Sequence, residues 1–373
     1  MTALATANVI REAMIQARQV FAEREEAIHA LSVALCSGEH MIMLGRPGVA
    51  KSAIVHWMAK TLGLDYFWTL LNPDTLREDL MGPISLKSLQ EDRWERNWAN
   101  LAVSDIAFTD EVGKASGQVL NLLLNVMEER RFDGYDLPLH CLIGASNETL
   151  DGEVEALWDR FAIRLVLNPV QDLENFRAML RSDVRPVQHY QISRSNLADL
   201  RATAELMAQT APDPVIDMLV EMKSLYTTRF DAYISDRRWR RVLKVAAGNA
   251  LLHGRSEIEI QDLHVARWML WANLDKRLAH MREVYSFVSS FVEKELGDLM
   301  ECQALAEELL GMAANERIRL AEAADLLMKA KTLARRVKKN LSNTGYKEQW
   351  TEILRKTEQI ESMVLDDESD QEA

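Results

Sequence analysis

Cysteine is scarce in this chain of 373 residues. The three cysteines, Cys36, Cys141 and Cys302, lie far apart, and no CxxC pair is present. This spacing excludes a disulfide framework and a cysteine-based zinc site, because both need cysteines grouped in pairs. We therefore expect a protein that works in a reducing compartment.

Long apolar runs and an excess of basic charge are also missing. The chain has no stretch of about 18 uncharged apolar residues that could span a bilayer, and Met1 to Ala7 lacks the features of a signal peptide. The 57 acidic residues outnumber the 44 basic ones and give a formal net charge of -13, which argues against a surface built to bind nucleic acid. We expect a soluble, cytoplasmic protein that does not insert into membranes and for which nucleic acid is an unlikely partner.

The composition that remains is that of a folded protein. Hydrophobic residues make up 48% and charged residues 27% of the chain, so a disordered or low-complexity chain is excluded. The length fits two or three packed domains.

The first half alternates between strand and helix patterns. Helical spacing over residues 8 to 37 precedes a predicted strand at 40 to 44, a helix at 51 to 62 and a strand at 66 to 71. Further strands are predicted at 103 to 109, 141 to 145 and 162 to 167, with helices at 117 to 130 and 150 to 159. This alternation predicts an α/β fold in which helices flank a parallel sheet.

The second half reads as helical throughout. After Asn168-Pro169 the pattern is that of helices, with a turn at residues 211 to 214 and a break at Gly254. Beyond about Arg277 we expect a helical hairpin or short coiled coil. The predicted domains are an α/β nucleotide-binding domain at 1–170, a helical lid at 171–276, the C-terminal hairpin at 277–365 and a disordered acidic tail at 366–373.

The strongest motif follows the first predicted strand and opens a predicted helix. It has the phosphate-loop pattern GxxxxGK[ST] except for one position, and its loop residues are Gly45, Arg46, Pro47, Gly48, Val49 and Ala50. In such loops backbone N–H groups surround the phosphates, the lysine, here Lys51, meets the β and γ oxygens, and the hydroxyl, here Ser52, ligates Mg²⁺. Because Ala50 replaces the final glycine, we expect this residue to have an ordinary negative φ.

Two acids end the third predicted strand at the same edge of the sheet. Asp110 is predicted to hold Mg²⁺ through its water shell, and Glu111 to polarise the water that attacks the γ-phosphorus of ATP. An acid-capped helix start would explain the same pair. Asn147, after the next strand, is a candidate to orient the water, although asparagine at a strand end is often only part of a turn.

Arginines supply the remaining candidates. Arg160 precedes the last predicted strand and could reach the γ-phosphate of a neighbouring subunit, unless it only pairs with an acid of its own chain. Arg164 and Arg130 are possible substitutes for it. Arg237, in a cluster of four arginines at a helix start, is predicted to face nucleotide; the alternative is a solvated basic face.

Taken together, these motifs resemble those of the AAA+ ATPases, and within them the MoxR family and its RavA-like branch. The resemblance covers about residues 8 to 275. It rests on eight strings in order, which are GRPGVAKS (45 to 52), DLMGPISLKSL (79 to 89), FTDEVGKA (108 to 115), LLLNVMEERRF (122 to 132), GASNE (144 to 148), LWDRFAIRL (157 to 165), ISDRRWRR (234 to 241) and LHGRSEI (252 to 258).

The resemblance implies roles for the candidate residues. Lys51 and Ser52 correspond to the Walker A pair, Asp110 and Glu111 to Walker B, and Asn147 to sensor 1. Arg160 corresponds to the arginine finger acting in trans, and Arg237 to the sensor 2 arginine, in cis or in trans. Residues 72 to 100 resemble the helix-2 insert, which faces a substrate or partner.

The resemblance also implies a hexameric ring that uses ATP and Mg²⁺ to remodel a protein client, beside a partner with a von Willebrand factor A domain. The β-rich appendage of RavA-like proteins has no counterpart in the strand pattern after residue 280. Two alternatives stay open. One is a nucleic-acid motor or defence-system ATPase, suggested by the basic run at 329 to 339, and the other is a nucleotide switch that hydrolyses ATP too slowly to do work.

Overall fold

The computed structural model describes residues 1–147, 155–181, 188–230, 234–271, 274–314, 320–341 and 347–371. Its residues group into two compact units. Unit 1 comprises Met1–Ala211, Ala232–Ile258 and Val265–Arg282, and unit 2 comprises Pro212–Asp231, Glu259–His264 and Glu283–Ala373.

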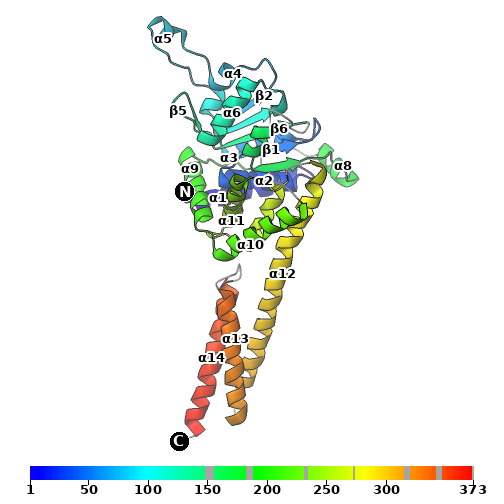
Figure 1. Cartoon of the computed structure of the whole chain (residues 1–373), viewed down its shortest axis with the longest axis vertical. Coiled ribbons are helices and arrows are strands. Elements are labelled where there is room, and N and C mark those ends of the chain that lie inside the picture. The colour runs from blue at the N-terminus through cyan, green and yellow to red at the C-terminus, as the bar shows by residue number, and fades with distance from the viewer. Residues whose placement is uncertain are drawn as a thin grey trace. The chain divides into compact units, whose positions relative to one another are not determined.

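A five-stranded parallel sheet forms the centre of unit 1 (Figure 1). Its strand order is β2-β3-β6-β1-β7. The strands are β1 (Met41–Leu44), β2 (Tyr66–Leu70), β3 (Ile106–Asp110), β6 (Cys141–Ser146) and β7 (Ile163–Val166). The register places Met41 beside Ile143 on one side and Ile163 on the other, so the ends of β1, β3 and β6 reach the same edge of the sheet.

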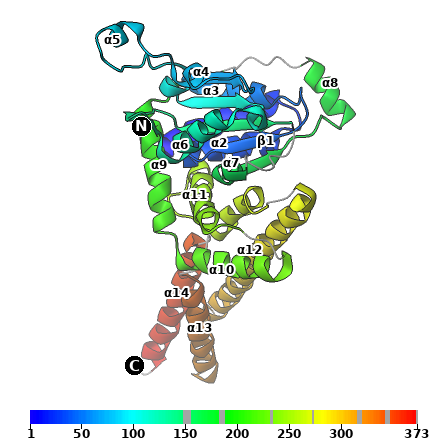
Figure 2. The same cartoon turned by 45° about the horizontal axis from the view of Figure 1, so that its top comes forward.

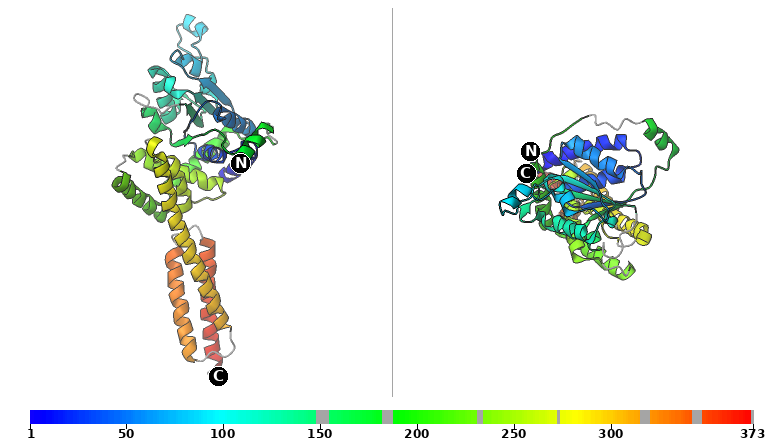
Figure 3. Two further views of the ribbon diagram at one scale, coloured as in Figure 1. Left: turned by 90° about the vertical axis from the view of Figure 1, so that its right-hand side faces the viewer. Right: turned by 90° about the horizontal axis from the view of Figure 1, so that it is seen from above.

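The central strands are buried on both faces, as expected for a parallel sheet covered by helices. The helices that lie around it are α1 (Ala3–Val20), α2 (Glu25–Ser37), α3 (Lys51–Leu62), α4 (Arg77–Met81), α6 (Gly117–Glu129) and α7 (Glu155–Arg160). They occupy both faces (Figure 3). The predicted α/β class is confirmed, and the predicted helix at 51 to 62 has those bounds in the structure.

Two details of the predicted sheet differ. The strand predicted at 103 to 109 begins only at Ile106, because Val103 is the last residue of the 3₁₀ turn Asn100–Val103. A two-stranded hairpin of β4 (Arg131–Phe132) and β5 (Tyr135–Asp136) was not predicted, because its strands are too short to give a pattern. Of the helix predicted at 150 to 159, residues 150–154 lie outside the described residues, as does Glu148 of the GASNE string.

The segment between β2 and β3 extends away from the sheet (Figures 1 and 2). Its base is held by Arg96, which donates to the carbonyl of Gly82 at 2.7 Å and lies over the rings of Trp98 and Phe132. Its tip contains the short helix α5 (Leu86–Gln90). The exposed apolar side chains of the tip are Leu86, Leu89 and Trp94.

Unit 1 also contains three later helices. These are α8 (Leu173–Arg181), α9 (Arg194–Gln209) and α11 (Asp236–Leu252). Both α9 and α11 pack against α1 and α2. The helix break predicted at Gly254 is confirmed, since α11 ends at Leu252 and Gly254 has a φ of 79°.

Unit 2 is entirely helical in its described part. It contains α10 (Asp213–Leu225), a π-helical turn at Tyr226–Phe230, part of the 3₁₀ segment Ile260–Trp268, most of α12 (Leu274–Ala313), α13 (Leu320–Leu341) and α14 (Lys347–Gln371). The C-terminal part of α12 lies beside α13 and α14 (Figure 3, left). They share a core that includes Leu309, Leu333 and Trp350.

The predicted helical C-terminal region is confirmed, and its described part is built from three helices rather than from the two of a hairpin. A third helix lets each apolar face pack against two neighbours. The tail predicted to be disordered from Asp366 belongs to helix α14 as far as Gln371, so the prediction is wrong for these residues. They continue a helix whose preceding turns are held by the packing of Ile360 and Val364. No helix among the described residues is long and apolar enough to cross a membrane.

Candidate nucleotide site

The loop between β1 and α3 has the backbone of a phosphate site. Gly45 has a φ of 153°, and a side chain there would collide with the carbonyl of Leu167. Gly48 has a φ of 83° with open space beside it. The N-terminal end of α3 points its unsatisfied N–H groups and positive dipole end into this loop, which favours an anion.

Ala50 departs from the prediction. It has φ 69° and ψ 23°, the left-handed region, and precedes the first residue of α3. The expected negative φ is therefore wrong. The turn requires the conformation that glycine supplies in the usual motif, and the alanine adopts it at a cost of about 1 kcal/mol. Backbone strain of this kind is found at functional sites, where the surrounding structure maintains it.

Lys51, Asn147 and Glu111 form a connected group that we call the phosphate-loop cluster. The Nζ atom of Lys51 donates to the carbonyl of Gly45 and, at 2.8 Å, to Oδ1 of Asn147. The amide nitrogen of Asn147 donates to Glu111. Asn147 thus joins the lysine to the carboxylate, so three residues predicted separately from three parts of the sequence lie in contact.

Burial and neighbouring charges act in opposite directions on the ammonium group of Lys51. Lys51 is buried, and burial lowers the pKa of its ammonium group while the carboxylates of Asp110 and Glu111 act in the opposite direction. Glu111 also has a left-handed backbone, with φ 54°. This turn leaves its carboxylate in contact with Asn147 and, at 3.4 Å, with the ammonium of Lys114.

The donor groups at this edge fit Mg²⁺. Ser52 offers a hydroxyl and Asp110 a carboxylate, and Mg²⁺ prefers oxygen ligands of which several are water or phosphate. The described residues contain no group of three or more histidine, cysteine, aspartate or glutamate side chains that would hold a metal ion by themselves.

A cavity of about 400 Å³ adjoins the loop. Its walls come from the loop, the end of α1 and α8, and its lining includes Phe21, Val49, Pro169, Phe176 and Met179. Apolar and aromatic walls beside a phosphate site suit a flat heterocyclic base. Sequence reasoning missed these residues, because they lie far apart in the chain and belong to no motif.

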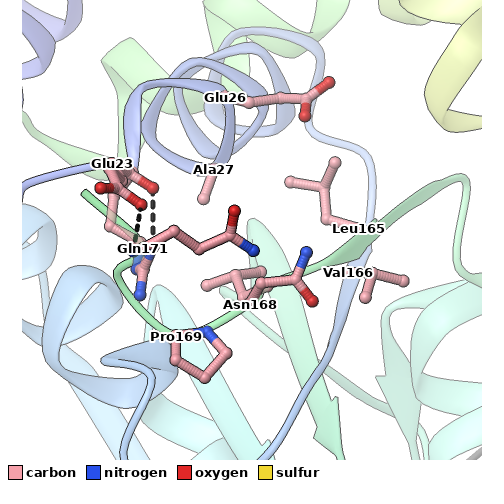
Figure 4. Close-up of a pocket in the computed structure, with 10 residues that line it drawn as sticks. Glu23, Glu26, Ala27, Leu165, Val166, Asn168, Pro169 and Gln171 are labelled. Atoms are coloured by element: carbon pink, nitrogen blue, oxygen red, sulfur yellow. Dashed lines mark hydrogen bonds between the residues drawn. The ribbon is translucent and has the colours of Figure 1, made fainter.

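Glu23 attaches α8 to this region. Its carboxylate accepts the backbone N–H groups of Gln171 and Asp172, each at 2.9 Å, and the side-chain amide of Asn175 at 3.2 Å. Figure 4 shows Glu23 beside Gln171 at the rim of a second, smaller cavity of about 240 Å³. These hydrogen bonds lower the pKa of Glu23.

Arg160 and Arg237 lie together in a second group, the arginine cluster. Both form ion pairs with the same carboxylate oxygen of Glu128, each at 3.1 Å, and Arg241 approaches this oxygen to 3.8 Å. These residues come from α6, α7 and α11. Within this chain Arg237 therefore pairs with the same carboxylate as Arg160 and not with a residue of the phosphate loop.

The two possible substitutes for Arg160 have other contacts, which argue against that role. Arg164 is buried, and its guanidinium donates to the carbonyls of Phe161, Trp158 and Trp271. Arg130 donates to the carbonyls of Gly38, Leu139 and His140. Both guanidinium groups hold the fold together, so neither is available to a neighbouring phosphate.

The basic run at 329 to 339 lies on α13. Its apolar members Ala330, Leu333 and Val337 belong to the core of the three helices. Lys329 pairs with Asp325 at 2.7 Å, and Arg336 with Asp298 and Glu301 at 3.1 and 2.7 Å. These pairs favour a solvated helix face over a nucleic-acid site.

Comparison with known proteins gives two family matches. Residues 8–206 match the model of the MoxR domain in the MoxR-vWA-beta-propeller ternary systems. Residues 214–281 match the model of an AAA lid domain.

Similar proteins include two uncharacterized proteins of Methanocaldococcus jannaschii. One is 33% identical over 296 residues, which is 78% of this chain and 77% of that protein, and the other is 30% identical over 280 residues, 73% of this chain and 74% of that protein. The chaperone MoxR1 of Mycobacterium tuberculosis is 23% identical over 69% of this chain and 73% of its own length.

The crystal structure of a "putative ATPase" from Cytophaga hutchinsonii matches with a TM-score of 0.60 and 20% identity, covering 77% of this chain and 95% of that one. At this identity the likeness supports the fold.

Proposed function

The chain belongs to the MoxR family of AAA+ ATPases, and on this premise we propose that it hydrolyses ATP at the seams of a ring, hexameric as the family resemblance implies, to remodel a protein client. The observation that carries the proposal is the bridge from Lys51 through Asn147 to Glu111 beneath the phosphate loop. It joins the ammonium group of Lys51, which we propose to bind phosphate, to the carboxylate of Glu111, which we propose as the base.

In the proposed reaction the chain's own groups position the nucleotide and the attacking water and neutralise the charge of the phosphates. Backbone N–H groups of the loop and Lys51 bind the phosphates, and the walls that include Phe21 and Phe176 bind the base. Glu111 accepts a hydrogen bond from the attacking water and takes its proton, while Asn147 orients the carboxylate. Ser52 and Asp110 would hold Mg²⁺, which neutralises charge on the β- and γ-phosphates.

The arginine cluster supplies the second half of the site. Arg160 and Arg237 pair with Glu128 rather than with the phosphate-loop cluster of their own chain. We assign them to the γ-phosphate of a neighbouring copy, Arg160 as the arginine finger and Arg237 as sensor 2 acting in trans. Each seam then combines a phosphate loop from one copy with two guanidinium groups from the next.

The client is expected to contact the exposed apolar tip formed by Leu86, Leu89 and Trp94. Exposed apolar side chains at the end of an extended segment suit transient binding of protein chains. A partner with a von Willebrand factor A domain is part of the proposal because the matched MoxR model is defined by such ternary systems. The RavA-like assignment and a cytoplasmic location stay predictions.

Mixing two inactive variants tests whether neighbouring copies share one nucleotide site. Lys51→Ala removes phosphate binding but keeps the arginines, and Arg160→Ala does the reverse. Each alone is expected to lose Mg²⁺-dependent phosphate release, by about 10³-fold for the arginine, while a mixture recovers part of the activity. Wild-type protein without Mg²⁺-dependent turnover, or a mixture no more active than its components, would contradict the proposal.

A further inference from the structure

Glu128 is the acid that all three arginines of the arginine cluster approach. Its carboxylate lies 3.1 Å from both Arg160 and Arg237 and 3.8 Å from Arg241, while its own side chain is 40% exposed. The three arginines come from α7 and α11, whereas Glu128 is near the end of α6. One partly exposed acid therefore joins three cations from separate parts of unit 1.

The arginines differ in how firmly they are held. Arg241 also donates to the carbonyls of Asp159 and Arg160, at 3.1 and 3.0 Å, and lies 3.6 Å from Glu39. Its side chain is only 15% exposed, against 25% for Arg160 and 43% for Arg237. Arg241 thus forms the fixed base of the cluster, and Arg160 and Arg237 are its more accessible members.

Bringing these two accessible guanidinium groups together requires a negative charge. Like charges repel at short range, and each guanidinium group has a long side chain that could point elsewhere. An oxygen 3.1 Å from both brings the two groups together, by a hydrogen bond from Arg237 and by charge alone for Arg160, and a guanidinium has five N–H donors. The cluster keeps a net positive charge and unused donors, which is the complement of a phosphate.

We propose that Glu128 is a positioning residue that holds Arg160 and Arg237 ready for the γ-phosphate of the neighbouring copy. It acts through the two arginines and does not itself touch the nucleotide. This inference rests on the proposed function, because it assumes that the arginines work across a seam. Positioning by fixed helices before the ligand arrives is the condition under which electrostatic groups lower a barrier most.

The test is the substitution Glu128→Gln, which keeps the shape and removes the charge. In the uniform ring we expect kcat for ATP hydrolysis to fall by about 10- to 100-fold while KM for ATP stays within about twofold, because positioning affects the transition state more than ground-state binding. The matched control is Glu129→Gln, which changes the next carboxylate on the same exposed helix end and should leave both constants unchanged.

The mixed ring separates positioning from a structural role. Glu128→Gln is placed either in the Lys51→Ala copy, which supplies arginines, or in the Arg160→Ala copy, which supplies the phosphate loop. The recovered activity should fall only in the first arrangement. An equal fall in both arrangements, no fall in either, or a kcat raised by the substitution overturns the inference. Failure of the mixture without Glu128→Gln contradicts the proposed function itself.

Discussion

The phosphate-loop cluster and the arginine cluster are built in opposite ways. The first depends on strained backbone, with left-handed conformations at Ala50, which precedes buried Lys51, and at Glu111, and it contains one ammonium group and one carboxylate. The second lies on regular helices, and its three arginines outnumber Glu128. The arginine cluster therefore keeps a net positive charge, whereas the charges of the phosphate-loop cluster balance. Under the proposed function this difference makes each cluster half of a site, which Mg²⁺ and a triphosphate would join.

The largest expected effect comes from a substitution in the phosphate-loop cluster alone. Glu111→Gln should lower the rate of ATP hydrolysis by about 10²- to 10⁴-fold, because it removes the base but keeps the hydrogen-bonding shape. Binding of a fluorescent ATP analogue should persist, since Lys51 and the loop are untouched. Phosphate release close to the wild-type rate would show that Glu111 is not the base.

A smaller effect tests the arginine half. Arg237→Ala should lower kcat by about 10- to 100-fold, because one donor to the developing charge is lost. Arg240→Ala is the matched control, since Arg240 lies exposed on the same helix α11 and should be neutral. Equal activities of the two variants would favour the alternative that Arg237 lies on a solvated basic helix face without a role in hydrolysis.

A further prediction concerns Glu23, which holds the start of α8 beside the cavity that we propose binds the base of ATP. Glu23→Gln should weaken ATP binding a few-fold with kcat unchanged, because the carboxylate that holds the start of α8 loses its charge. The hydrogen bonds from Gln171 and Asp172 lower the pKa of Glu23, so the attachment should persist at neutral pH and be lost only as the pH falls through that lowered value. Nucleotide titrations between neutral and acidic pH measure this, with Glu25→Gln as control. A decrease in kcat instead of affinity would argue against this role.

The smallest effect concerns strain. Ala50→Gly should change the free energy of unfolding by less than about 1 kcal/mol, because relief of the left-handed conformation is offset by a more flexible unfolded chain. ATP turnover should stay near wild type. Denaturant unfolding measures the first quantity, and a large loss of stability would mean that the methyl group of Ala50 has a packing role.

Most of the phosphate-loop cluster was predictable from the sequence. Strand and helix patterns around residues 40 to 71 are strong because a parallel strand is buried on both faces and a helix follows a glycine-rich turn. In such a sheet Lys51, Glu111 and Asn147 all follow strand ends, which meet at one edge. Local spacing and a general topological rule were sufficient to group them.

The arginine cluster was only partly predictable. Arg160 and Arg237 were named, but Glu128 was passed over within the string LLLNVMEERRF, and Arg164 and Arg130 stayed as substitutes. Separating them required their hydrogen bonds to Trp271 and Gly38, which lie far from them in the chain. The backbone of Ala50 was predicted wrongly because the demands of the turn outweigh the residue's own preference.

By itself, the sequence determined the α/β class, the position of the phosphate loop and the identity of its lysine, serine and acids, because these depend on periodicity and short-range spacing. Only the tertiary structure decided that Glu128 collects the arginines, that apolar walls form beside the loop and that three helices build the C-terminal region. Those features arise from contacts between segments far apart in the chain, whose partners no local pattern specifies.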